Sequence, residues 1–194
     1  PLGKCLQKPP SCAGGGKPGE TCVEACQVKP ATIPFEPVKT YEWGGKTVAP
    51  FDTDVMMAPI VVQLDDDDCD GKITARDVPE IAFTTMTNGK EAEAGTLHVI
   101  SIVKGEVKEK WTKAGVFATK HLAGGNFDGK PGNEVVACGD DGYVYAFNGA
   151  TGAQLWKSDA PYRCSVPAIA DLEHDGVVKV IVEGAILRGA DGTK

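Results

Sequence analysis

Short hydrophobic runs separated by polar turns dominate the chain from residue 39 onward. Each run holds β-branched, aromatic or small apolar residues over five to eight positions and is bounded by Gly, Asp or Asn. The clearest runs are 59–64, 80–85, 96–103, 134–138, 143–147, 166–172 and 177–182. Runs of this length at such intervals are typical of antiparallel strands. The pattern therefore predicts an all-β fold built from short strands.

Two phrases recur along these strands. The first reads strand, Gly-containing turn, strand and Trp, and it occupies 95–111, 142–156 and the stretch from 185. The second is a hydrophobic strand that leads through an acidic loop into another strand, and it occupies 58–83, 121–136 and 166–182. A repeat of about 45 residues with four short strands has the size of a β-propeller blade. We therefore expect β-propeller blades of four short antiparallel strands.

The repeats also suggest how the chain is organised. They supply two full blades and parts of one or two more, whereas closure of a propeller takes at least about four. We therefore expect residues 39–194 to form an incomplete propeller, completed by further blades of the same or another chain. Residues 1–38 are rich in Cys, Pro and Gly and lack apolar periodicity, which predicts an irregular N-terminal segment.

The seven cysteines bear on the cellular compartment. Four of them lie in the first 26 residues, at Cys5, Cys12, Cys22 and Cys26. Their spacing, without a nearby His, favours the disulfides of an exported protein over a zinc site, paired either in sequence order or crossed. Cys138 and Cys164 are candidates for a further disulfide, and Cys69 is expected to be exposed. We thus expect a secreted or cell-surface protein.

Charge and hydropathy exclude two classes of partner. The chain has 27 acidic and 20 basic residues and a net charge of −7, which argues against nucleic-acid binding. No apolar run approaches the roughly 20 residues that a membrane-spanning helix needs. We expect neither a nucleic-acid partner nor a membrane span.

Residues 66–77 carry the sharpest chemical motif. In a 12-residue loop that begins at Asp66, carboxylates occupy positions 1, 3, 5 and 12, and Gly71 stands at position 6, where the turn needs a positive φ. Ca²⁺ takes roughly six to eight oxygen ligands, and alternate residues of a tight loop can supply them. The predicted main calcium site consists of Asp66, Asp68, Asp70, the carbonyl of Lys72, and Asp77. The alternative is a solvated acidic turn without a metal.

Two other loops are weaker candidates for metal binding. The second loop offers Asn126, Asp128 and Glu134, but Lys130 stands among them. The third loop offers Asp171, Glu173 and Asp175, in alternation before Gly176. Lys179 follows this third loop, and its ammonium group could neutralise the carboxylates in place of a metal.

No catalytic constellation stands out. The three histidines lie in different repeats, and no Ser-His-Asp or Cys-His spacing suggests a nucleophile. His98 falls within a strand pattern and is expected to be packed. The tryptophans could form a sugar-binding platform, but their places near strand ends favour core anchors between blades. These residues are Trp43, Trp111 and Trp156.

These phrases resemble known families. The order of hydrophobic strand, Asp-rich loop with Gly, acidic residue and second strand resembles the FG-GAP or VCBS repeats of secreted and cell-surface propellers, integrin-type heads among them. Residues 143–156 read YVYAFNGATGAQLW and resemble a blade of the quinoprotein-like propellers. The loop 66–77 is also similar to dockerin calcium loops, although Pro79 bars the helix that should follow. The resemblance covers about 40–194 and implies a calcium-binding propeller.

Three functions remain open at this point. The favoured one is a non-catalytic extracellular module, stabilised by Ca²⁺, for adhesion, surface assembly or recognition of a protein or carbohydrate ligand. The alternative is a propeller-based enzyme such as a polysaccharide lyase or a quinoprotein-like oxidoreductase, because propellers host many chemistries. A dockerin-like adaptor is the third.

Overall fold

The computed structural model describes residues 36–44, 54–91 and 94–194. Its residues from Lys39 onward belong to one compact unit. All regular structure in the described ranges is β, with eleven strands and no helix, which confirms the predicted all-β class. The four N-terminal cysteines and nearly all of the predicted irregular segment 1–38 lie outside the described residues.

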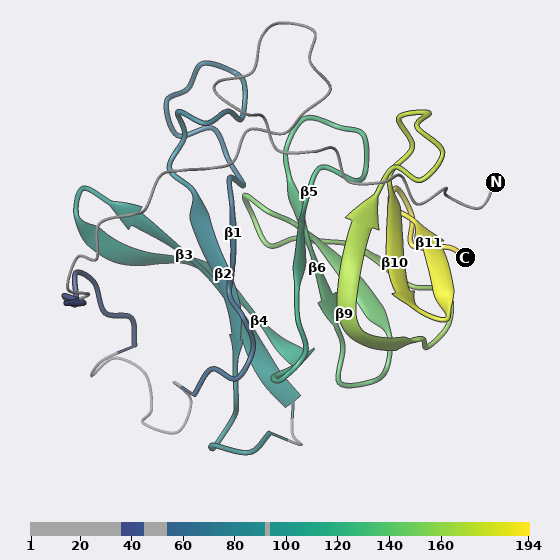
Figure 1. Cartoon of the computed structure of the whole chain (residues 1–194), viewed down its shortest axis with the longest axis horizontal. Coiled ribbons are helices and arrows are strands. Elements are labelled where there is room, and N and C mark those ends of the chain that lie inside the picture. Colours follow the sequence, from purple (N-terminus) through teal and green to yellow (C-terminus); the bar gives the residue numbers. More distant parts are fainter. Residues whose placement is uncertain (1–35, 45–53, 92–93) are drawn as a thin grey trace, which may run out of the picture. The chain divides into compact units, whose positions relative to one another are not determined.

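The strands form three antiparallel sheets in chain order (Figure 1). The first sheet contains β1 (Ile60–Val62), β2 (Glu80–Thr85), β3 (Ala94–Val103) and β4 (Glu106–Phe117). The second contains β5 (Ala123–Gly125), β6 (Glu134–Cys138), β7 (Val144–Asn148) and β8 (Gln154–Lys157). The third contains β9 (Arg163–Ala170), β10 (Lys179–Glu183) and β11 (Ala185–Arg188). Each strand pairs with its neighbour in sequence, and none of the sheets closes on itself.

The second sheet is covered on both faces. Every residue of β6 is buried, and successive side chains of a strand point to opposite faces. Val135 and Ala137 belong to a core cluster shared with the first sheet. Val136 between them belongs to a cluster shared with the third sheet. This burial on both sides explains why the run 134–138 is uninterruptedly apolar after its first residue.

Tryptophan side chains join successive sheets. Trp111 of β4 donates a hydrogen bond from Nε1 to the carbonyl oxygen of Gly149 in the second sheet, at 2.6 Å. Trp156 of β8 donates the corresponding bond to the carbonyl oxygen of Gly189 after β11, at 2.7 Å. Both indoles pack in or against the core clusters, as their interpretation as core anchors predicts.

Glycines make this close packing of the indoles feasible. Gly152 and Gly192 have φ angles of 67° and 73°, in the region that side chains disfavour. A Cβ atom on Gly152 would lie 2.6 Å from the ring of Trp111, and one on Gly192 would lie 2.5 Å from the ring of Trp156. The same contact therefore recurs at both sheet junctions.

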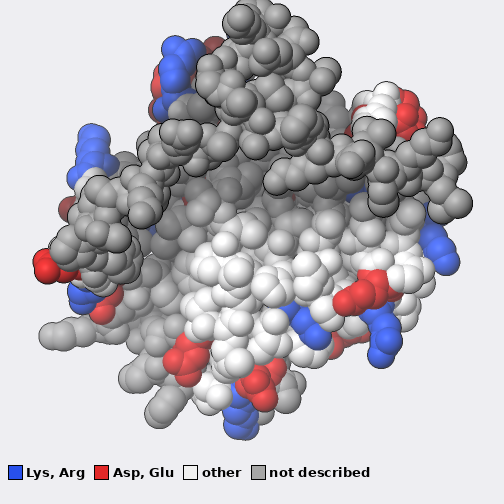
Figure 2. Space-filling model, viewed as in Figure 1, with Lys and Arg blue, Asp and Glu red and all other residues white. Residues whose placement is uncertain are grey.

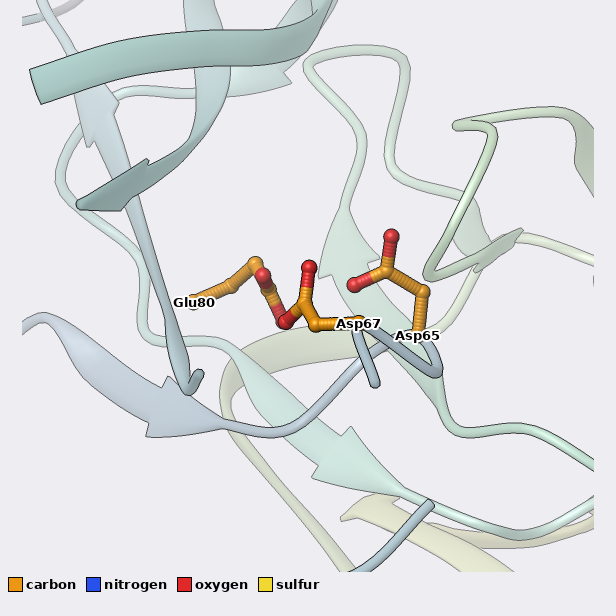
Figure 3. Close-up of side chains that lie close together, drawn as sticks. All are labelled: Asp65, Asp67 and Glu80. Carbon is orange, nitrogen blue, oxygen red and sulfur yellow. The ribbon is translucent and has the colours of Figure 1, made fainter. Parts of the chain in front are cut away.

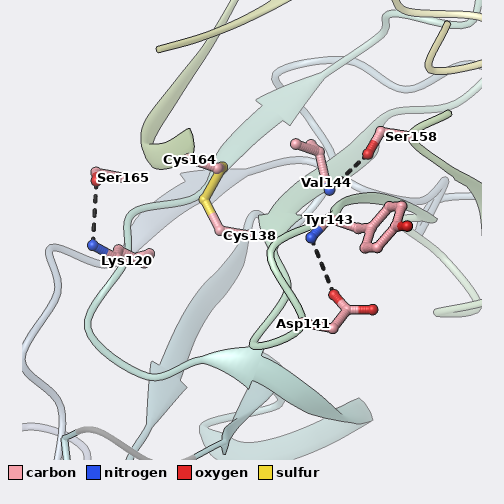
Figure 4. The surroundings of a disulfide bond; sticks show 8 residues. All are labelled: Lys120, Cys138, Asp141, Tyr143, Val144, Ser158, Cys164 and Ser165. Atoms are coloured by element: carbon pink, nitrogen blue, oxygen red, sulfur yellow. Dashed lines mark hydrogen bonds between the residues drawn. A yellow bond between two sulfur atoms is a disulfide. The ribbon is translucent and has the colours of Figure 1, made fainter. Parts of the chain in front are cut away.

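A disulfide adds a covalent link between the second and third sheets. Cys138 at the end of β6 bonds to Cys164 in β9, which confirms the predicted pairing (Figure 4). Beside it, Lys120 Nζ donates a hydrogen bond to Ser165 Oγ at 3.2 Å. Cys69 is exposed and has a free thiol. A disulfide fits an extracellular protein, since such bonds persist in oxidising compartments.

Candidate functional site

The first acidic loop, between β1 and β2, is closed by hydrogen bonds to its own carboxylates. Asp66 accepts the backbone N–H of Asp70 at 3.1 Å and that of Gly71 at 2.7 Å. Asp70 in turn accepts the N–H of Lys72 at 2.9 Å. Cys69 and Gly71 adopt φ angles of 60° and 82°. The sequence forms this turn because short Asp side chains can bond to nearby backbone and Gly accepts a positive φ.

Three carboxylates meet on this turn. Asp66, Asp68 and Asp70 each offer an oxygen within 4.8 Å of the others. Desolvation, followed by the negative charges of Asp70, Asp77 and Asp66, raises the pKa of Asp68. The guanidinium of Arg76 offsets part of this charge, because its Nη2 lies 2.8 Å from Asp70 Oδ2. A divalent cation between the carboxylates would remove the remaining repulsion, so the donor set fits Ca²⁺.

Asp77, predicted at position 12 of the loop, braces the backbone. It is only 3% exposed and accepts the N–H of Thr74 at 2.6 Å and that of Asp67 at 3.0 Å. The hydrogen bond from Thr74 is the main cause that lowers the pKa of Asp77, against its desolvation. Asp77 is not in the group of three carboxylates. The structure thus brings together positions 1, 3 and 5 of the predicted site.

The third loop, between β9 and β10, repeats three hydrogen bonds of the first turn. Asp171 accepts the N–H of Asp175 at 3.2 Å and that of Gly176 at 2.9 Å. Asp175 accepts the N–H of Val177 at 2.9 Å. The φ angles of His174 and Gly176 are 58° and 84°, close to those at the same places in the first loop. Two loops more than 100 residues apart in the sequence therefore share one conformation.

The third loop also gathers its carboxylates. Asp171, Glu173 and Asp175 offer oxygens within 4.8 Å of one another. Lys179 Nζ lies 3.5 Å from Glu173, so an ammonium already offsets part of the charge, as the sequence suggested. This loop is a weaker metal candidate than the first because a cation would compete with Lys179.

The second loop, between β5 and β6, is arranged differently. Asn126 donates its amide to the carbonyl of Lys130, and Asp128 forms an ion pair with Lys130 Nζ at 3.0 Å. Glu134 is buried and accepts the N–H of Phe127 at 3.0 Å. All three predicted ligands are thus engaged with the chain itself.

A further acidic group surrounds the start of the first loop. Asp65, Asp67 and Glu80 bring carboxylate oxygens within 4.8 Å of one another (Figure 3). Lys110 Nζ hydrogen-bonds to Asp65 and lies 3.2 Å from Glu80, which is completely buried. Glu80 also accepts the N–H of Leu64 at 2.8 Å. An ammonium group therefore already offsets the charge of Asp65 and Glu80.

Burial and mutual contact shift the pKa values of Glu80 and Lys110. Desolvation raises the pKa of Glu80 despite the bond from Leu64 and the charge of Lys110. Burial acts to lower the pKa of Lys110, but hydrogen bonding to Asp65 and the charge of Glu80 raise it overall. Sequence reasoning missed Lys110, because it lies 30 and 45 residues from its partners and no local pattern marks it.

The buried Glu134 gives a testable pH dependence. Its burial, with the nearby charge of Asp128, raises its pKa, whereas the N–H of Phe127 lowers it. A raised folded pKa means that Glu134 favours folding below its unfolded value of about 4.3 and loses that contribution as pH rises through the folded value. Glu134→Gln keeps an acceptor for Phe127, so we expect its stability relative to wild type to increase from pH 4 to pH 7. Urea unfolding in the presence of a chelator measures this difference, and a pH-independent difference would contradict it.

His98 lies in a buried hydrogen-bonded chain. Its Nδ1 is 2.7 Å from Glu109 Oε1, and its Nε2 is 3.0 Å from Thr85 Oγ1. The rings of Trp43 and Phe83 pack against the imidazole, with centroids at 4.6 and 5.4 Å. The order hydroxyl, imidazole, carboxylate is that of a nucleophilic triad, but Thr85 is only 1% exposed and lies out of reach of a substrate. His98 is only 7% exposed, as expected for a packed His.

Charges of both signs are mixed on the face of the molecule that Figure 2 shows. Figure 2 shows Lys, Arg, Asp and Glu of the described residues scattered around an area that holds none of them. On this face, no extended patch of one sign is visible.

Among the described residues there is no helix that could cross a membrane.

Comparison with known proteins adds no relative to this picture. None of the protein-family models, curated proteins or solved structures compared with the chain matches it. The functional interpretation therefore rests on the geometry of the loops, and above all on the turn that the first and third loops share.

Proposed function

We propose that this chain is an extracellular, calcium-stabilised β-propeller module that recognises a ligand and has no catalytic role. The observation that carries the proposal is the turn with three converging carboxylates at Asp66, Asp68 and Asp70. Its recurrence at Asp171 and Asp175 supports a structural device that belongs to the architecture. The same turn in two of the three sheets is consistent with a repeat protein whose loops bind calcium.

The packing of the sheets supports the propeller part of the proposal. The first strand of the second sheet, β5, contacts the first strands of both neighbouring sheets, β1 and β9. Propeller blades place their first strands next to one another in this way, around a central channel. A Trp-to-carbonyl hydrogen bond joins the first sheet to the second, and an equivalent bond joins the second sheet to the third, as expected for repeated blades.

Calcium would act on stability. Without a cation, folding places Asp66, Asp68 and Asp70 together at a cost in repulsion. Desolvation is the main cause of the raised pKa of Asp68, and the negative charges of its neighbours add to it. A bound Ca²⁺ would replace that repulsion with shared coordination and would bind only the folded loop. Binding to the folded state alone stabilises it by about 2.7 kcal/mol at a calcium concentration 100 times Kd.

Calorimetric titration of chelator-treated protein with CaCl₂ tests the proposal. We expect binding in the wild type that Asp68→Asn weakens at least about tenfold, because the substitution removes a charged ligand. Asp67→Asn is the matched control, since it removes the same charge from the adjacent residue, which lies in the group with Glu80. Absence of both heat and thermal stabilisation at millimolar Ca²⁺ would overturn the proposal.

A further inference from the structure

A cavity of about 630 Å³ lies at the junction of the first and second sheets. Residues of three segments line it: the first acidic loop (64–73), the second loop (126–133) and the turn between β7 and β8 (148–150). Its volume falls within the range of about 300–1,000 Å³ that is typical of small-molecule sites. The cavity adjoins the proposed calcium turn, because Asp66 and Gly71 are among its lining residues.

The walls of the cavity are fixed by contacts across the sheet junction. Asn133 donates its side-chain amide to the carbonyl of Gln63, which ties the second loop to the first sheet. Gly149 donates its N–H to the carbonyl of Asn133 at 3.0 Å. Leu64 packs so closely on Gly149 that a Cβ there would lie 2.5 Å from its Cδ2. The cavity is therefore preformed by the fold.

Polar groups with unused hydrogen-bonding capacity line this cavity. Asp65 Oδ1 is buried and has no hydrogen-bond partner among the described residues. Asn148 uses Oδ1 to accept the N–H and the hydroxyl of Thr151, while its Nδ2 donates to no described residue. Asn133 engages Nδ2 alone, which leaves its Oδ1 without a donor among those residues. The unused groups thus include both acceptors and a donor, and a buried acceptor without a partner calls for a ligand or a water.

The charge of the lining selects the class of ligand. Asp65, Asp66 and Lys72 give the lining charges of both signs, and Lys110 pairs with Asp65, so the lining favours an uncharged ligand over a strongly charged one. Hydroxyl groups both donate and accept, so a polyhydroxylated molecule can satisfy acceptors and donor together. The apolar side chains of Ile73 and Pro131 on the same walls suit the C–H face of a sugar ring.

We propose that this cavity binds a neutral mono- or disaccharide, through hydrogen bonds to Asp65, Asn133 and Asn148. The inference rests on the proposed function, because it names the ligand class of a binding module. Binding should be weak, since the described residues of the lining include no aromatic ring and hydrogen bonds to water are exchanged for hydrogen bonds to protein.

Saturation-transfer difference NMR on the calcium-loaded protein tests this proposal. The probes are the methyl glycosides of glucose, galactose, mannose, fucose and N-acetylglucosamine, together with maltose, cellobiose and lactose. We expect at least one probe to receive saturation transfer and to titrate with a millimolar Kd. If none of them receives saturation transfer at 10 mM, the proposal is overturned.

Two variants locate the binding. Asn148→Asp keeps the acceptor for Thr151 and removes the Nδ2 donor, so we expect about tenfold weaker binding. Ala150→Trp places a large ring at the exposed mouth of the cavity and should abolish binding. This variant tests the site independently if Asn148→Asp folds poorly. Asn88→Asp makes the same chemical change on an exposed turn outside the lining and should leave Kd unchanged. Saccharide binding that persists unchanged in both cavity variants would place the site elsewhere and overturn the proposal.

The calcium titration separates this inference from the proposed function. A protein that binds Ca²⁺ and no saccharide probe would remove the inference and leave the calcium-stabilised module intact. A protein that binds a saccharide in this cavity and takes up no Ca²⁺ would overturn the calcium-stabilised module and leave the saccharide site intact.

Discussion

Trp156→Ala should lower the free energy of unfolding by about 3–5 kcal/mol, the range for loss of a large buried side chain. Trp156 is only 7% exposed, and its ring packs edge-on to Phe127 at a centroid distance of 6.2 Å. Its Nε1 also provides the hydrogen bond to Gly189 that joins the second sheet to the third. The variant therefore leaves both a cavity and an unpaired carbonyl at the junction. Chemical denaturation followed by circular dichroism measures the loss.

Two controls assign the effect to the junction. Trp156→Phe keeps much of the ring and removes the N–H donor, so we expect a loss of about 1 kcal/mol. Leu155→Ala truncates the preceding residue of β8, which is 39% exposed, and should cost much less than Trp156→Ala. Equal losses for Leu155→Ala and Trp156→Ala would show that the junction contributes nothing specific.

Removal of the Cys138–Cys164 disulfide should lower stability by about 3–4 kcal/mol. The bond closes a loop over a sequence separation of 26 residues and restricts the unfolded chain accordingly. It also ties β6 to β9 across the junction that Trp156 packs. The double variant Cys138→Ala, Cys164→Ala should show this loss in urea unfolding, because Ala leaves no polar group unpaired at the buried Cys138.

The exposed Cys69 provides the control for this prediction. Cys69→Ser alters a free, exposed thiol, so it should leave the free energy of unfolding unchanged within about 0.5 kcal/mol. A double variant as stable as the wild type would show that the disulfide does not stabilise the protein.

Local pattern was sufficient to predict the strands. The runs 80–85 and 134–138 coincide with β2 and β6, and each of the other predicted runs overlaps a strand without matching its bounds. These segments are recognisable because apolar side chains must be removed from water, and their neighbours in sequence are turn formers. Strand β9 begins at Arg163, ahead of the predicted run 166–172. Arg163 pairs through the backbone with Glu183 of β10. The hydrophobic pattern does not mark this start, because Arg163 is polar.

The loops were predictable for the same reason. The turn at Asp66, and its counterpart at Asp171, depends on bonds that span at most five residues, so the sequence carries the full signal. Asp77 departs from the calcium-loop pattern because its burial leaves it next to backbone N–H groups that lack other acceptors.

By itself, the sequence determined the all-β class, the approximate places of most strands and the places of the acidic loops, because these depend on neighbours along the chain. The tertiary structure alone decided that Lys110 neutralises Asp65 and Glu80, that each Trp bonds to the next sheet, and that a cavity forms between two loops. Such contacts join residues 30 or more positions apart. They depend on strand register and on the packing of one sheet on another, and no local pattern encodes either.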